Sequence, residues 1–105
     1  MIVKGTLTIV IKELFGYCPV QGEGTINGER FYFRARGEHW SMAIGVPDEK
    51  DPRSIYSGGK WNYDEPYDNE SFAAGWMPLE EAAQLIAKAA YFWLREQEAI
   101  EDEKA

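Results

Sequence analysis

The stretch that decides the fold is residues 21–44, QGEGTINGERFYFRARGEHWSMAI. It contains two signals for tight turns, Asn27-Gly28 and Gly37-Glu38, and each lies between runs in which side chains of two kinds alternate. Asn-Gly favours a type I′ hairpin turn because both central residues of that turn need positive φ, whereas a leading glycine favours type II′. We therefore predict three antiparallel strands joined by two-residue turns.

Turns of two residues determine which side chains share a face of the sheet. Counting outward from the turns places Gln21 opposite Arg34 and Phe31 opposite Ile44. One face then receives apolar side chains and two glycines: Gly22, Gly24, Phe31, Phe33, Ala35, Trp40, Met42, Ile44 and Val46. The other face receives, apart from Ala43, the residues Gln21, Glu23, Thr25, Arg30, Tyr32, Arg34, Arg36, His39 and Ser41. A slip of one residue would mix the two sets, so their clean division supports this register.

The segment before this stretch predicts another strand. Residues 6–12 alternate, with Leu7, Ile9 and Ile11 on the side of the core. Residues 13–19 contain glycine and proline and are typical of a connection.

The segment after it is less regular. Residues 47–53 form a predicted polar loop. Residues 54–63 fit either one bulged strand or a small hairpin about Gly58-Gly59, and the pattern does not separate the two. Residues 64–75 are acidic and predict a loop that its aromatic side chains hold in place.

A helix is predicted from residue 79 to about residue 100. Pro78 suits the first turn of a helix, and Glu80 and Glu81 complement the dipole at its N-terminus. An apolar stripe follows helical spacing: Leu79, Ala82, Ala83, Ile86, Ala89, Ala90, Trp93 and Leu94. Together these patterns predict an α+β domain over residues 1–100. Its antiparallel β-meander of four to five strands has one C-terminal helix packed on one face, and residues 101–105 form a frayed acidic tail.

Leu85 and Phe92 widen the helical stripe beyond what one sheet needs. We expect this flank to be covered by aromatic residues from the irregular segments: Trp61, Tyr63, Tyr67, Phe72 or Trp76. The chain is then a monomer. The alternative is a dimer formed through Leu85 and Phe92.

Composition narrows the function classes. The chain has 105 residues and a net charge of −7, and nearly all of the acidic excess lies after residue 46. This balance argues against non-specific binding to nucleic acids and against an anionic membrane surface. No apolar run approaches the roughly 20 residues of a spanning helix. A single cysteine excludes an internal disulfide and fits the cytoplasm.

Motifs for catalysis, metals and phosphates are missing. Cys18 and His39 are the only thiol and imidazole, and strand parity places them on opposite faces. The acids of residues 48–51 lack the spacing of a calcium loop, and neither glycine pair opens a helix as a phosphate loop does. We therefore expect no catalytic residues, no metal and no cofactor.

The predicted site is the polar face of the sheet, where arginine side chains can bind carboxylates or phosphates in two-point fashion. Its candidate binding residues are Gln21, Glu23, Arg30, Tyr32, Arg34, Arg36, His39 and Ser41. The leading hypothesis is a small, non-enzymatic protein that docks on a protein partner. One alternative is a protein that uses this face to bind an anionic ligand, or a minor enzyme that acts on such a ligand there. Another is a building block of an oligomer. The polar face could then be an ordinary solvated surface without a function. In scale and acidity the chain is similar to the small inhibitors of host defence that phages and mobile elements encode, such as anti-CRISPR proteins.

Overall fold

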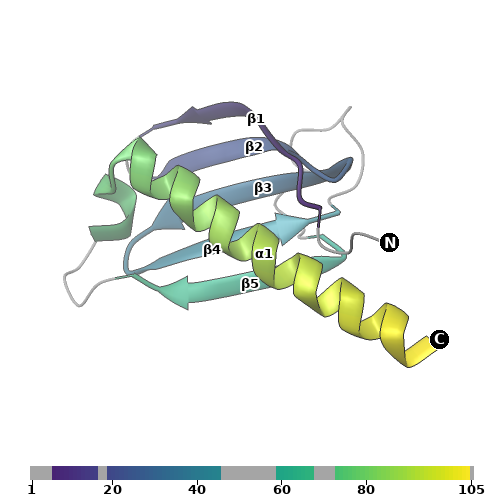
Figure 1. Ribbon diagram of the computed structural model, residues 1–105. Helices are drawn as coiled ribbons and strands as arrows, with labels where there is room; N and C mark the ends of the chain where they lie inside the picture. Colours follow the sequence, from purple (N-terminus) through teal and green to yellow (C-terminus); the bar gives the residue numbers. More distant parts are fainter. Residues whose placement is uncertain (1–5, 17–18, 46–58, 68–72, 105) are drawn as a thin grey trace.

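The computed structural model describes residues 6–16, 19–45, 59–67 and 73–104. They form a five-stranded antiparallel sheet in sequence order, and one long helix crosses one of its faces (Figure 1). The elements are β1 (Ile9–Phe15), β2 (Val20–Ile26), β3 (Glu29–Arg36), β4 (His39–Ile44), β5 (Trp61–Pro66), η2 (Ala73–Trp76) and α1 (Leu79–Lys104). The predicted fold class is confirmed.

The two central hairpins have the predicted register. Gln21 lies opposite Arg34 across β2 and β3, and Phe31 lies opposite Ile44 across β3 and β4. Asn27 and Gly28 both have positive φ, at 48° and 83°, as a type I′ turn requires. The turn chemistry therefore determines the pairing of three strands.

Asn27 also ties the β2–β3 turn to the segment before β1. Its side-chain Oδ1 accepts a hydrogen bond from the Thr8 backbone at 2.7 Å, and its Nδ2 donates to the Thr6 carbonyl at 3.1 Å. Its own backbone N–H donates to the Thr8 carbonyl at 2.9 Å. Asparagine thus supplies both a left-handed backbone and three hydrogen bonds at this position.

The core lies between the sheet and α1. The bulky side chains of the predicted core face are almost fully buried, among them Phe31, Phe33, Trp40, Met42 and Ile44. The helix contributes Ile86 and three alanines without exposed surface: Ala82, Ala89 and Ala90. Alanine has no side chain beyond Cβ, so this centre of the helix lies close to the large rings of the sheet.

Two details of the helix differ from the prediction. Leu79 begins α1 but is 43 % exposed, because the first turn of the helix lies at the margin of the core. The helix also continues to Lys104, beyond its predicted end near Ile100, while fraying of the tail stays a prediction. Residues 101–104 contain no glycine or proline, and glutamate and lysine are good helix formers.

The first strand departs from its predicted pattern. It continues to Phe15 through residues that were expected to connect strands, and a β-bulge lies between Ile11 and Glu13. The bulge inserts Lys12 as an extra residue and reverses which side chains point inward. Leu14 therefore takes the core position opposite Gly22, while Ile11, predicted to be buried, is 37 % exposed.

The last strand also takes in residues that were expected to form a loop. Residues 64–66 belong to β5, which pairs with β4 and places Trp61 opposite Ile44, and residues 73–76 form η2. Alternating burial along β5 explains the difference, because every second side chain packs toward α1. The predictions for Cys18, Val46, residues 47–53, Phe72 and the proposed hairpin about Gly58-Gly59 lie outside the described residues. In the described ranges, no helix is long and apolar enough to cross a membrane.

Candidate functional site

The face of the sheet turned away from α1 carries the predicted binding residues, and we call it the polar face. Arg36, His39 and Ser41 are exposed there. Half-buried side chains make up most of the rest: Gln21, Glu23, Thr25, Arg30 and Arg34. The register brings all eight predicted residues to one surface, as expected from the sequence.

Tyr32 is the exception on this face, since it was expected to be accessible and is only 7 % exposed. It lies directly opposite Ala43, and the two form a small buried cluster of their own. Its hydroxyl donates a hydrogen bond to Gln21 Oε1 at 2.8 Å. The small side chain of Ala43 leaves room for the ring, so Tyr32 supports the surface rather than presenting itself to a partner.

The β3–β4 turn presents exposed charged side chains at one end of the polar face. Arg36, Glu38 and His39 are all exposed around it. Backbone hydrogen bonds hold the turn from behind: the Gly37 carbonyl accepts from the N–H of Ala74 at 3.0 Å, and the Glu38 carbonyl accepts from that of Tyr67 at 2.7 Å. The turn is therefore fixed in position by two segments that follow β5.

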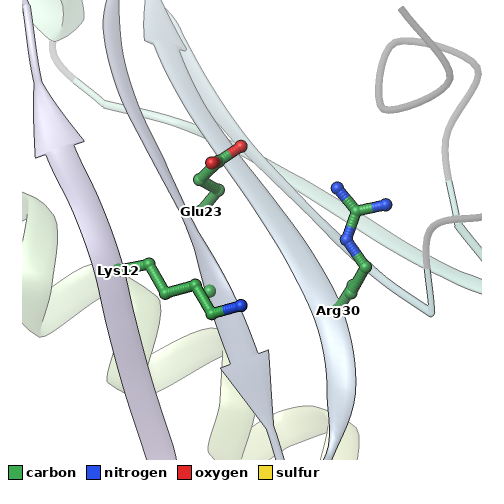
Figure 2. A pocket seen from close by; sticks show the side chains of 4 residues that line it. Lys12, Glu23 and Arg30 are labelled. Carbon is green, nitrogen blue, oxygen red and sulfur yellow. The ribbon is translucent and has the colours of Figure 1, made fainter. Parts of the chain in front are cut away.

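A pocket lies at the other end of the polar face. It is lined by Lys12, Glu23, Gly24 and Arg30 and has a volume of about 190 Å³. Figure 2 shows Lys12 and Arg30 on opposite sides of Glu23, with the three side chains coming from β1, β2 and β3. Glu23 and Arg30 were predicted as site residues, but Lys12 was not, because the bulge that brings it here leaves no mark on the alternation.

The pocket and the β3–β4 turn are separate places. Arg30 and Arg36 lie near opposite ends of β3, and six residues of extended chain span roughly 20 Å. The polar face therefore offers two distinct groups of charges. We treat them as two sites.

The sheet is joined to α1 by polar side chains of β5 and the residue after it. Trp61 Nε1 donates to Glu96 at 2.8 Å, and the Tyr67 hydroxyl donates to Glu81 at 2.6 Å. Between them, Lys88 Nζ lies 2.9 Å from Glu65. The sequence did not indicate these polar partners, which join α1 to the sheet on the side opposite the polar face.

Glu65 is the centre of this group. The Tyr63 hydroxyl donates to it at 2.6 Å. That hydrogen bond and the one from Lys88 lower the pKa of Glu65 below its usual 4.5, and the bond to Glu65 raises the pKa of Tyr63. Tyr63 also packs against Phe92, with ring centroids 5.5 Å apart, so it covers part of the flank that was expected to need covering. Trp76 is 63 % exposed, and whether the chain is a monomer stays a prediction.

No group of three or more metal-ligating side chains gathers among the residues that the structure describes. His39 lies exposed on the polar face, while Cys18 is outside the described part, so the separation of the two stays a prediction. No protein-family model, curated protein or solved structure matches this chain.

Proposed function

We propose that this is a non-catalytic binding protein that docks on a protein partner through the β3–β4 turn end of the polar face. The observation that carries the proposal is the combination of exposed charges and a fixed backbone at that turn. Arg36 and His39 are accessible, and the carbonyls of Gly37 and Glu38 are both held by hydrogen bonds from other segments. A surface that is ordered before it binds loses less conformational entropy on binding.

The chemistry of the turn favours an acidic patch on the partner. The Arg36 guanidinium is a planar fork that pairs with carboxylates through two hydrogen bonds, and the His39 ring adds an N–H donor beside it. The chain as a whole carries a net charge of −7, so it repels an acidic surface in most orientations. Charge therefore favours docking through the β3–β4 turn, because other orientations bring acidic residues of this chain close to the acidic patch of the partner.

The small size of the chain suits a protein that acts by covering a partner's surface. A typical protein interface takes roughly 800 Å² from each side. The described part of the sheet offers one open face for such contact, since α1 occupies the other (Figure 1). We extend the proposal to inhibition by occlusion, the mode of action expected from the scale and acidity of the chain.

The test compares capture of a partner by three baits: the wild type, the double variant Arg36→Glu with His39→Glu, and Arg95→Glu. Arg95 is an exposed cation on α1, on the other side of the molecule, and serves as the matched control. We expect one protein to be captured by the wild type and by Arg95→Glu, and to be lost with the double variant. Its purified form binds the wild type less tightly as salt increases.

The variants are first compared by thermal unfolding. Exposed substitutions away from the core change the free energy of unfolding by only about 0.5 kcal/mol, so all three baits are folded under the conditions of capture. Equal affinity of the isolated partner for the wild type and the double variant would remove the turn from the interface. Equal loss with Arg95→Glu would show a general effect of charge.

A further inference from the structure

The pocket at the bulge end of the polar face is formed by a local irregularity of β1. The bulge between Ile11 and Glu13 places the extra residue Lys12 at the rim of the pocket. Figure 2 shows the Lys12 side chain reaching from β1 over β2. Bulges commonly re-aim a side chain toward a functional position.

The pocket contains charges of both signs. Lys12 and Arg30 are cationic and Glu23, between them, is anionic (Figure 2). Within the described ranges Lys12 and Glu23 make no ion pair, although both line the same small volume. Glu13 lies directly opposite Glu23 across β1 and β2, which adds a second negative charge beside the first. Like charges at directly opposed positions are unfavourable, and a bound cationic group relieves them.

These charges match a ligand that carries both signs. A simple anion is attracted by Lys12 and Arg30 but repelled by Glu23, and a simple cation meets the reverse. A zwitterion places its anionic group near the two cations and its ammonium group near Glu23. The volume of about 190 Å³ is below the roughly 300–1,000 Å³ of pockets for drug-sized ligands, so a molecule of a few heavy atoms fits best.

We propose that the pocket formed by Lys12, Glu23, Gly24 and Arg30 binds a small zwitterion of the α-amino acid type. The carboxylate of the ligand lies toward Lys12 and Arg30, and its ammonium group lies toward Glu23. Among the residues that the structure describes, the lining of the pocket holds no large apolar side chain, so it recognises the common head of amino acids rather than one side chain. This site lies about 20 Å from the β3–β4 turn and does not depend on the proposed docking.

The experiment is a titration of the isotope-labelled protein with glycine, followed through the backbone amide signals in NMR spectra. Acetate and methylammonium are titrated separately as controls, because acetate carries only the carboxylate of glycine and methylammonium carries only its ammonium group. We expect glycine to shift the signals of Lys12, Glu23, Gly24 and Arg30 with saturation, at a dissociation constant in the millimolar range typical of partly exposed charges. Acetate and methylammonium should each bind at least tenfold more weakly.

The variants Lys12→Gln and Glu23→Gln should each weaken glycine binding at least tenfold, whereas Lys12→Arg keeps the charge and retains binding. Arg36→Gln is the matched control on the same face, and it leaves glycine binding unchanged while it weakens partner docking. The same spectra show that each variant is folded. Acetate binding as tightly as glycine would overturn the proposal in favour of an anion site. Equal binding of methylammonium, or glycine shifts that do not saturate, would overturn it as well.

Discussion

The two edges of the sheet are held in different ways. At one edge, side chains of β5 and Tyr67 reach α1 through three polar contacts, to Glu96, Lys88 and Glu81. At the other edge, Ile9 and Leu14 of β1 pack their apolar side chains against the core, and the strand has its bulge at Lys12. It also leaves apolar side chains accessible: Val10 and Phe15 are each 47 % exposed.

The difference shows that a sheet edge can be secured either by polar side-chain contacts or by apolar packing of a bulged strand. An edge strand presents unpaired backbone groups to other chains, and proteins discourage such pairing with bulges and charges. β1 has a bulge with Lys12 and Glu13 beside it, and β5 has Asp64, Glu65 and a terminal proline. Each edge is therefore protected, and the bulge at the β1 edge also helps to form the pocket lined by Lys12.

The largest effect is expected from a change that breaks the backbone fit of β1. A Cβ atom at Gly24 would collide with the Val10 carbonyl oxygen, and this neighbour is backbone that cannot move aside without disturbing the strand. Gly24→Val should therefore lower the free energy of unfolding by about 3 kcal/mol or more, at the upper end of the usual cost of overpacking. Urea unfolding measures it. The control is Thr25→Val, one residue along β2, whose free energy of unfolding should stay close to that of the wild type. Equal stability of the two variants would show that the close approach of the Val10 backbone to Gly24 does not hold β1 in place.

A smaller effect, which depends on pH, is expected at the β5 edge. Glu65→Gln removes the charge that pairs with Lys88 and accepts from Tyr63, and at pH 7 it should cost about 0.5–1 kcal/mol, as partly exposed ion pairs do. The control is Asp64→Asn, an exposed neighbour in the same strand. Thermal unfolding at a series of pH values measures both variants.

The direction of the pH dependence follows from the pKa shifts. The pKa of Glu65 is lowered in the folded state, so its contribution is complete above the unfolded value of 4.5 and is lost as pH falls through the folded pKa. The pKa of Tyr63 is raised, so its contribution is complete below 10.0 and is lost as pH rises through the folded pKa. Glu65→Gln should therefore equal the wild type only at acid pH. A constant difference from pH 3 to pH 7 would contradict the assignment.

The predictable part of the molecule is the part that local chemistry determines. Asn27-Gly28 and Gly37-Glu38 specify their turns, and those turns fix the pairing of β2, β3 and β4. The burial of Tyr32 also had a signal in the sequence, because the same register places Ala43 opposite it. That signal was missed because tyrosine was grouped with the polar residues.

The rest of the structure depends on three-dimensional geometry that the spacing of residue types along the sequence does not reveal. A bulge adds one residue without changing composition, so Lys12 looks like the last member of a regular alternation. The contacts of Trp61 with Glu96 and of Tyr67 with Glu81 depend on the angle at which α1 crosses the sheet (Figure 1). The place of Lys12 in the pocket and the polar partners of Trp61 and Tyr67 on α1 were therefore beyond reach of the sequence, although aromatic cover of this helix flank was expected.

The smallest effect on stability is expected from deleting Lys12, which sharpens the comparison of the edges most directly. The register runs from Ile11 opposite Gly24 to Glu13 opposite Glu23, so the deletion joins two pairings that are already consecutive on β2. Leu14 keeps its core position, and the free energy of unfolding should stay within about 0.5 kcal/mol of the wild type, as for a surface change. Deleting Ile11 instead also removes the bulge, but it keeps the lysine, which then takes the place opposite Gly24. Comparing the two deletions therefore separates the effect of the bulge from that of the lysine. The edge without its bulge and lysine is regular and less protected, so sedimentation should show self-association of the Lys12 deletion at concentrations where the wild type shows none. A strongly destabilised Lys12 deletion would mean that the bulge supports the fold itself, and that the pocket is a by-product of that support.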